Sequence, residues 1–317
     1  MTYLDRVDPE LRPTFAASPV IDLSKDIPKL RAAMTAVNAP LLAAAPETPD
    51  VESEDRDAEG VRVRVYRRTD TVGQVRPAML WIHGGGMCFG SVEGDDFMCR
   101  TWTSQLGCVI VSVDYRLAPE HPYPAPVEDC TTALRWLAAH TDELDVDPSR
   151  IVVGGASAGG GLAAGTVLRN HADGNPVPIA FQVLIFPMID DRFITPSSQE
   201  MTDPHAWNRE SNRHGWAAYL GRLTGSDDVP IDAAPARATV DQLRGLPPAY
   251  IDVGELDPFR DEDIAYAQKL LQAGVACELH VTPGAYHASE ASVLGAASSR
   301  RIRGYRRDVL QRVLGTP

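Results

Sequence analysis

The sequence has 317 residues, 44% apolar and 23% charged, so a chain of this length can bury a sizeable core without disulfides or a structural metal. Its formal net charge is −13 and it has no basic run, which disfavours binding to nucleic acid or to an anionic membrane. The five cysteines are odd in number and form no CxxC pair, so we expect free, mostly buried thiols rather than a disulfide framework or a zinc site.

The N-terminal part of the chain carries no strand pattern. It begins MTYLDRVDPELRP, with early acids and no apolar stretch like that of a signal peptide, and no later run reaches the ~18 apolar residues of a membrane span. We therefore expect a cytoplasmic protein. Residues 1–50 have helical character, and the acidic stretch at 50–60 is predicted to be an exposed connection.

From residue 61 onward, strand-like and helix-like segments alternate. Apolar or alternating runs predict strands at 61–66, 78–82, 108–113, 151–155, 181–186, 249–253 and 278–281. Helical patterns lie between several of them, at 127–140 and 261–274 among others. Such alternation is typical of the α/β class, with a mostly parallel central sheet flanked by helices. Ligands on such sheets bind at the carboxyl ends of the strands.

The polar, Trp-containing residues 187–247 interrupt this alternation. We interpret them as an insertion over the top of the sheet, which joins the helices of residues 1–50 in a small helical cap. The predicted organisation is therefore an N-terminal cap segment at 1–50 and a core at 51–317 that contains the insertion.

The strongest local motif is G-x-S-x-G at Gly155–Gly159, with Ser157 at its centre. An apolar strand precedes it and a helical pattern follows, which is the setting of a nucleophile elbow. Small neighbours suit the strained backbone of such a turn. The alternative is a glycine-rich start of a helix with an incidental serine.

The sequence His83-Gly84-Gly85-Gly86 follows the predicted strand at 78–82. Consecutive glycines can turn their N–H groups toward the oxyanion of a tetrahedral intermediate, and the N–H of Ala158 would complete that oxyanion hole. We expect His83 to support the loop rather than to act in catalysis. The alternatives for the loop are a tight turn or a phosphate cradle.

Bulky residues near these motifs are the predicted walls of a small acyl pocket. Met87, Cys88 and Phe89 follow the glycine loop directly, and their apolar character suits an acyl group better than a phosphate. Trp207 and Trp216 lie in the insertion and are expected to narrow the entrance.

An acid and a base are expected later in the chain than the serine. Asp257 follows the strand at 249–253 and is better placed than Asp252, inside that strand, or Asp261, at the start of a helix. His287 lies in the loop after the last predicted strand, at the edge where the other candidates also lie.

Five motifs in order resemble the hormone-sensitive-lipase family of microbial esterases: HGGG (83–86), DYRLAPEHPYPA (114–125), GASAGG (155–160), DPFRDED (257–263) and YHAS (286–289). The resemblance covers the chain from about residue 60 to its end. It implies an α/β-hydrolase core with an eight-stranded sheet and a helical cap. It also implies hydrolysis of carboxylic esters without a cofactor, and the sequence shows no cluster of metal ligands that would predict a metal.

Under this resemblance the family's nucleophile, acid and base map to Ser157, Asp257 and His287, and its oxyanion donors to the HGGG glycines and Ala158. Two positions depart from the family pattern. Ala156 stands where Asp or Thr is usual, so a local polar contact is missing, and Ala288 follows the histidine where Gly is common.

One motif carries no evident chemistry. The charged residues of the DYRLAPEHPYPA segment, Asp114, Arg116 and Glu120, are expected to form a buried structural ion network.

The predicted function is hydrolysis of short-chain acyl esters through a Ser-His-Asp triad and a covalent acyl-enzyme. The predicted partner is a small-molecule ester, and the resemblance also suggests a homodimer. A lactone, amide or carbamate hydrolase would use the same triad. A non-catalytic small-molecule receptor on the same fold is a further alternative, disfavoured because such receptors lose the triad histidine and His287 is present.

Overall fold

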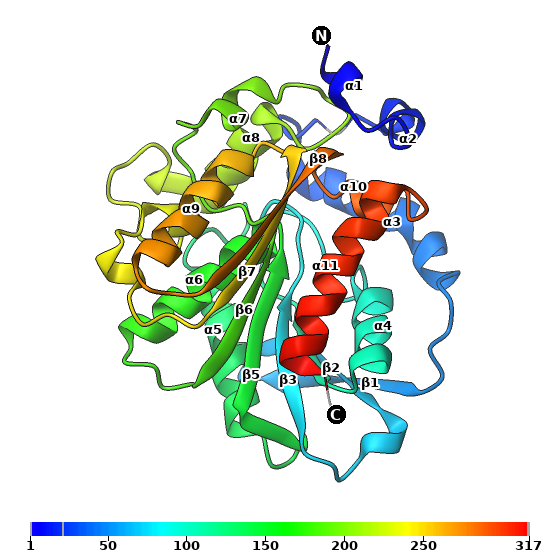
Figure 1. Ribbon diagram of the computed structural model, residues 1–317, viewed down its shortest axis with the longest axis vertical. Coiled ribbons are helices and arrows are strands. Elements are labelled where there is room, and N and C mark those ends of the chain that lie inside the picture. Colours follow the sequence, from blue (N-terminus) through cyan, green and yellow to red (C-terminus); the bar gives the residue numbers. More distant parts are fainter. Residues whose placement is uncertain (1, 21, 316–317) are drawn as a thin grey trace.

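The computed structural model describes residues 2–20 and 22–315 (Figure 1). Its centre is an eight-stranded sheet in the order β1-β2-β4-β3-β5-β6-β7-β8. The strands are β1 (Val51–Ala58), β2 (Val61–Arg68), β3 (Arg76–Ile82), β4 (Val109–Val113), β5 (Val146–Ala156), β6 (Ile179–Ile185), β7 (Ala249–Leu256) and β8 (Cys277–Tyr286). β1 and β2 run antiparallel to their neighbours, and the strands from β4 to β8 are parallel. The predicted mostly parallel sheet is confirmed.

Helices cover both faces of the sheet. One face is covered by α5 (Ala125–Ala139), α6 (Ala158–Ala172) and α9 (Arg260–Gln272), and the other by α4 (Asp96–Leu106) and α11 (Ala297–Leu314). The strand β3 shows why both faces must be covered. Its Leu80 and Ile82 pack into the first of the two cores, while Met79 and Trp81 pack into the second. Successive side chains of a strand point to opposite faces, so a strand that is apolar throughout is buried on both.

The first strand corrects the sequence prediction for residues 50–60, which form the edge strand β1 rather than a loop. Its outward side chains are acidic and pair with arginines of β2: Glu52 accepts from Arg67 at 2.7 Å, and Asp55 accepts from Arg64 at 2.6 Å. Charged residues are common on edge strands, where they prevent pairing with other chains. The apolar alternation that signals a strand is therefore absent here.

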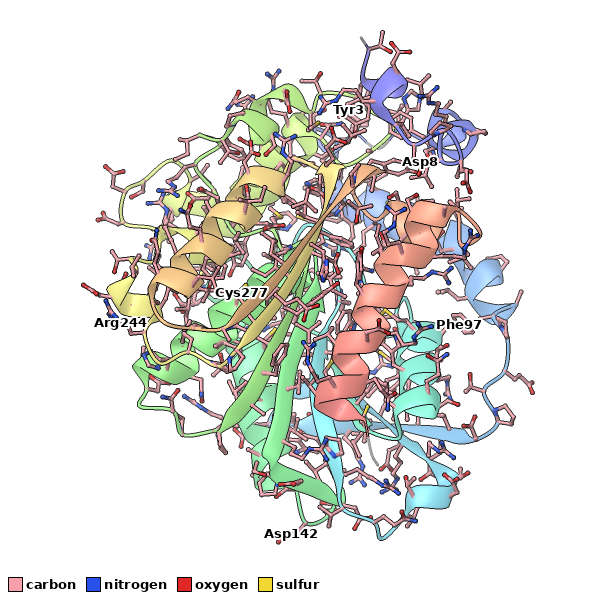
Figure 2. The ribbon with its side chains drawn as sticks, in the orientation of Figure 1. Tyr3, Asp8, Phe97, Asp142, Arg244 and Cys277 are labelled. Carbon is pink, nitrogen blue, oxygen red and sulfur yellow. The ribbon has the colours of Figure 1, made fainter. Side chains whose placement is uncertain are left out.

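The N-terminal segment and the insertion lie at the end of the sheet where the parallel strands finish (Figure 1). Their helices are α1 (Tyr3–Arg6), α2 (Arg12–Ala17), α3 (Ile27–Ala43), α7 (Pro196–Glu200) and α8 (Arg209–Leu220). The Tyr3 hydroxyl donates to the carbonyl of Leu256, and the Asp8 N–H donates to that of Gly284, which ties this segment to the ends of β7 and β8 (Figure 2). A separate apolar cluster joins the two parts, with Phe15 and Met201 among its members.

The remaining elements are short: the helix α10 (Ser289–Ser292) and 3₁₀ turns at Thr69–Thr71, Gly221–Leu223, Pro235–Arg237 and Asp241–Leu243. No helix within residues 2–20 and 22–315 is long and apolar enough to cross a bilayer. Four of the five cysteines are buried and unpaired, and Cys277 is unpaired and partly exposed on β8 (Figure 2).

The pairing across β1 and β2 generates a stability prediction. Hydrogen bonds from Arg64 and then Arg62 lower the pKa of Asp55 to about 2. We expect Asp55→Asn to lower the free energy of unfolding by about 1 kcal/mol at most, because the carboxylate is partly exposed and screened. The folded-state pKa lies below the unfolded value of about 3.9, so this contribution is complete above pH 4 and disappears as the pH falls through 2.

Chemical denaturation at several pH and salt values would measure this effect. The matched control is Glu47→Gln, which removes the same charge from an exposed loop residue with no charged partner in the described part of the chain. An equal loss of unfolding free energy in both variants would contradict the prediction that the cross-strand pairs of Asp55 stabilise the fold.

Candidate active site

Ser157 occupies a strained turn between β5 and α6. Its backbone has φ 56° and ψ −122°, in a region that L-residues rarely adopt, and its N–H donates to the carbonyl of Ile185 at 2.8 Å. The flanking glycines are sterically required. A Cβ on Gly155 would lie 2.2 Å from the carbonyl oxygen of Gly159, and one on Gly159 would lie 2.0 Å from that of Ile82. The spacing of the motif therefore follows from how closely the strand, turn and helix pack.

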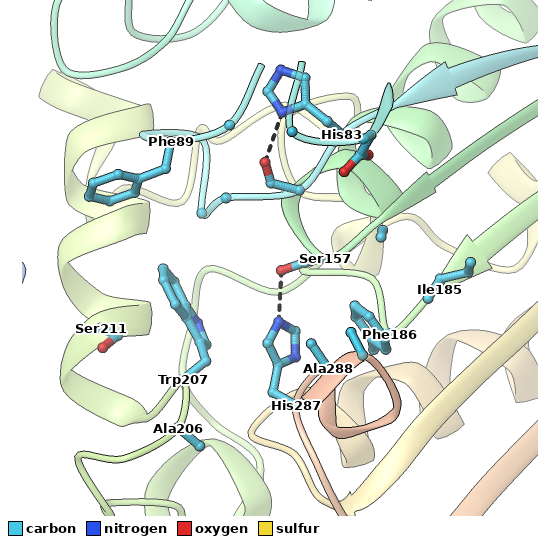
Figure 3. A pocket seen from close by; sticks show the side chains of 18 of the residues that line it. His83, Phe89, Ser157, Ile185, Phe186, Ala206, Trp207, Ser211, His287 and Ala288 are labelled. Atoms are coloured by element: carbon cyan, nitrogen blue, oxygen red, sulfur yellow. Dashed lines mark hydrogen bonds between the residues drawn. The ribbon is translucent and has the colours of Figure 1, made fainter. Parts of the chain in front are cut away.

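Three predicted residues are brought into hydrogen-bond contact at the ends of different strands. The Nε2 atom of His287 lies 3.0 Å from the Oγ of Ser157, and its Nδ1 lies 2.7 Å from Oδ2 of Asp257 (Figure 3). Asp257 is fully buried, and its other oxygen accepts the N–H of Phe259 at 3.0 Å. Both carboxylate oxygens are thus engaged, which fixes the orientation of the acid. The arrangement can move a proton between the serine and the histidine.

Aromatic rings hold the imidazole of His287 in place. The Phe186 ring meets it edge-on at 4.7 Å, and the Phe259 ring does so at 5.2 Å with an interplanar angle of 87°. The indole of Trp207 lies at 6.4 Å. Edge-to-face contacts of this kind restrict the rotation of a ring. Phe186 and Phe259 were not among the predicted site residues, although Phe186 ends the predicted strand at 181–186 and Phe259 lies within the DPFRDED motif.

The glycine loop supplies free N–H groups near the serine. Gly85 and Gly86 have φ values of +120° and +59°. No backbone or side-chain acceptor within the described residues binds the N–H of Gly85, Gly86 or Ala158. A Cβ on Gly85 would lie 2.2 Å from the carbonyl oxygen of Phe89, and one on Gly86 would lie equally close to the Trp207 ring. The loop can therefore hold only glycine at these two positions.

His83 holds this glycine loop in place through its side chain. Its Nδ1–H donates to the carbonyl of Gly84 at 2.8 Å, and its ring stacks on Tyr115 at 4.2 Å. The Tyr115 hydroxyl in turn donates to the carbonyl of His83. Burial lowers the pKa of His83 below its ordinary value, which favours the neutral ring. Gly84 packs against the turn itself, since a Cβ there would lie 2.9 Å from the carbonyl oxygen of Ala156.

A cavity of about 540 Å³ opens in front of the serine. In Figure 3 the line from Ser157 to His287 divides its wall in two. One side carries Phe89, Trp207 and Ser211, and the other carries Ile185, Phe186 and Ala288. The N-terminal segment adds Leu23 and Met34. Among residues 2–20 and 22–315, no three His, Cys, Asp or Glu side chains are grouped as metal ligands.

Three of the predicted pocket residues lie elsewhere. Met87, Cys88 and Trp216 are at most 1% exposed and belong to the main core, so only Phe89 and Trp207 line the cavity as predicted. The loop after the glycines packs on the segment that follows β4, where the Ala118 N–H donates to the carbonyl of Met87, and the side chains of Met87 and Cys88 are buried in the core.

Trp216 is turned away from the cavity by helix geometry. It lies five residues after the cavity residue Ser211 on α8, well around the helix from it. It packs against Tyr219 instead, at a ring distance of 6.0 Å.

The charges of the DYRLAPEHPYPA segment do not form one buried network, so that prediction was wrong. Each binds a different partner, in the pairs Asp114–Arg62, Arg116–Asp129 and Glu120–Arg31. The segment runs along the surface, and its successive side chains reach different neighbours.

The two departures from the family pattern have different consequences. Ala156 lies on the cavity wall and offers no polar group there. Ala288 has φ +58°, in the left-handed region that glycine adopts most easily. This backbone conformation explains why glycine is common at the position, and the structure shows that alanine can occupy it.

The mostly parallel sheet, the strained serine turn and the glycine loop at the strand ends are those of a serine ester hydrolase on an α/β-hydrolase core. A family model described as alpha/beta hydrolase fold matches residues 79–290. The chain belongs to this family, within its hormone-sensitive-lipase-like group, and the resemblance seen in the motifs is confirmed.

Several relatives with similar sequences are esterases. The carboxylesterase NlhH of Mycobacterium tuberculosis is 36% identical over 309 residues, 94% of each chain. The esterase LipI of the same organism is 38% identical over 253 residues, 79% of this chain and 78% of LipI. The solved structure of a bacterial heroin esterase has a TM-score of 0.93 and 43% identity, and the match covers 99% of this chain and 100% of that one. These likenesses support ester hydrolysis as the activity of this chain.

The packing of the serine turn predicts a sharp contrast between two glycine substitutions. Gly159→Ala should lower the free energy of unfolding by about 3 kcal/mol or more, or prevent folding, because its Cβ would meet backbone oxygens that cannot move away. Gly304→Ala on α11 is the control, since nothing lies within 4 Å of its Cβ. It should stabilise the protein by about 0.5–1 kcal/mol. Thermal unfolding of both variants measures the difference, and a Gly159→Ala protein as stable as wild type would refute the packing argument.

Proposed function

We propose that this chain hydrolyses short-chain carboxylic esters through Ser157, His287 and Asp257, by way of a covalent acyl-enzyme. The observation that carries the proposal is the continuous chain of hydrogen bonds from Asp257 through His287 to Ser157, at 2.7 and 3.0 Å. The serine faces a cavity and stands beside unpaired backbone donors, as acyl transfer requires.

In this mechanism Nε2 of His287 takes the proton of Ser157 while Oγ attacks the ester carbonyl. Asp257 accepts from Nδ1 and stabilises the imidazolium that forms, and the N–H of Phe259 keeps the carboxylate oriented. His287 then gives its proton to the departing alcohol. Water enters, and the same histidine activates it to release the acid.

The oxyanion of each tetrahedral intermediate would be bound by the N–H groups of Gly85, Gly86 and Ala158. Ala158 is the first residue of α6, so the positive end of that helix also faces the oxyanion. Loss of a single donor of this type typically costs about 10²–10³ in kcat.

We further propose that residues 1–50 and 187–247 act as a cap that limits the acyl chain. Trp207 packs on Gly86 and fills the space beside the oxyanion loop. Leu23 and Met34, from the N-terminal segment, close the cavity further. In this proposal the acyl group lies on the side of Phe89 and Trp207, and the alcohol lies on the side of Ile185 and Phe186 (Figure 3).

The triad proposal predicts that Ser157→Ala and His287→Ala each reduce kcat by several orders of magnitude, and that the double variant is hardly worse than either. Asp257→Asn should reduce kcat by a smaller factor. Fluorophosphonate should label wild type at Ser157 and fail to label Ser157→Ala. The matched control is Ser211→Ala, a cavity serine with no place in the triad, which should keep most of the activity. Full activity in Ser157→Ala would end the assignment.

The cap proposal predicts a preference for acetyl to hexanoyl esters, which Trp207→Leu should relax. We expect the ratio of octanoate to acetate hydrolysis, as kcat/KM, to rise by about tenfold, since each extra methylene is worth roughly 1–3 kcal/mol in a fitted pocket. Trp136→Leu on α5, away from the cavity, is the control and should leave the ratio unchanged. Emulsified long-chain triglyceride hydrolysed as fast as soluble butyrate esters would contradict the proposed chain-length limit.

A further inference from the structure

A buried group of charges lies beside His287, and two of its members, Glu290 and Arg306, also line the cavity in front of Ser157. Arg306 of α11 donates from Nε and Nη2 to the two oxygens of Asp252, both at 2.7 Å, and from Nη1 to Glu290 at 2.6 Å. The three side chains are at most 10% exposed. We call Asp252, Arg306 and Glu290 the ion triad. None of the three was predicted to act at the site.

Each contact of Arg306 reaches a segment that carries part of the catalytic machinery. Asp252 lies on β7, the strand that leads into Asp257. Glu290 lies on α10, directly after His287. The guanidinium carbon is also 5.1 Å from the centre of the Phe186 ring, and that ring meets the imidazole of His287 at 4.7 Å. One side chain thus connects the acid strand, the base loop and a ring that contacts the base.

The conformation of Phe186 has to be maintained by its surroundings. Its φ of +33° is in the left-handed region, which costs a bulky residue on the order of 1–3 kcal/mol. Its N–H donates to the backbone carbonyl of Asp252 at 2.7 Å, and its ring lies under the Arg306 guanidinium. The ion triad and the strained Phe186 therefore hold each other in a single arrangement.

The energetics favour a geometric role over a stabilising one. Burial alone would lower the pKa of Arg306, but Asp252 and Glu290 hold it above its ordinary value, so the guanidinium stays charged. Buried ion pairs often contribute little net stability compared with apolar residues of equal volume, because desolvation offsets their attraction. Removal of one partner is costly, because the others are then left buried and uncompensated.

We propose that Arg306 is a positioning residue for the catalytic base: through Glu290 and the Phe186 ring it sets the orientation of His287 toward Ser157. The proposal rests on the proposed function, because it assigns a task to Arg306 only if His287 is the base. Catalysis is sensitive to such placement, and a displacement of about 1 Å can cost about 10²-fold in rate.

The test compares Arg306→Lys with Arg237→Lys. Arg237 lies in the part of the insertion that does not line the catalytic cavity, and it forms a similarly buried bidentate pair with Asp191, at 2.7 and 2.9 Å. Lysine keeps the charge and loses the planar fork in both. For each variant we would measure the melting temperature, kcat and KM on a soluble acetate ester, and the rate of fluorophosphonate labelling.

Arg306→Lys should lower kcat and the labelling rate together by about 10- to 100-fold, with KM changed much less. Arg237→Lys should lower the melting temperature to a similar degree and leave both rates close to wild type. Phe186→Leu should reduce the same two rates, and its combination with Arg306→Lys should be less than additive, because both act through His287.

A folded Arg306→Lys protein with wild-type kcat and labelling would overturn the proposal, as would equal losses of rate in the two arginine variants. If Arg306→Lys does not fold, the test uses Glu290→Gln instead, which keeps the shape of the side chain and leaves the Arg306–Asp252 pair intact. A Glu290→Gln protein with wild-type kcat and labelling would also overturn the proposal. Failure of fluorophosphonate to label Ser157 in wild type would instead refute the proposed function, so the two failures are distinguishable.

Discussion

The structure depends on one tight turn, in which Ser157 is held between β5 and α6 with its backbone in a strained conformation. The strain persists because α6 starts so close to β3 that only a glycine fits at position 159, against the carbonyl of Ile82. The close packing of α6 against β3 also brings the glycine loop, which follows β3, next to Ser157. The proposed nucleophile and the proposed oxyanion donors therefore share one packing constraint, and neither can move without the other.

The parallel sheet brings the rest of the site to this turn. β3, β5, β6, β7 and β8 all end at one edge, so short loops are enough to deliver His287, Asp257 and Phe186 to neighbouring positions. The N-terminal segment and the insertion then close the cavity from above. They are continuous with the core, because Leu23 and Ile27 of the N-terminal segment and Trp216 of the insertion pack into it, while a smaller apolar cluster holds α1 and α2.

Buried charge is placed where geometry matters most. The ion triad connects β7, α10 and α11 next to His287, at the wall of the cavity, and Asp257 accepts two hydrogen bonds in a fully buried position. In both arrangements charged groups lose their hydration, and well-packed apolar groups of similar volume would be buried at a lower cost in free energy. The charged groups instead fix the orientation of the side chains, because their hydrogen bonds permit only one orientation of each partner.

The sequence by itself determined the residues whose identity is dictated by local geometry or by chemistry. The glycines around Ser157 and in the HGGG loop are required by close backbone approach, and the positions of Asp257 and His287 after apolar strands followed from the strand pattern. The family, the sheet and the esterase class could be predicted for the same reason. The homodimer and the cytoplasmic location stay predictions.

Tertiary structure decided what depends on contacts between distant segments. The strand β1 was missed because its stabilising pairs lie on β2, and Met87 and Trp216 were assigned to the pocket because composition does not tell which way a loop or a helix face turns. The ion triad was invisible for the same reason: Asp252, Glu290 and Arg306 lie on three elements, and only the packing of α11 against β7 brings their charges together. The sequence alone does not show which charged side chains become neighbours, because their pairing depends on how distant elements pack.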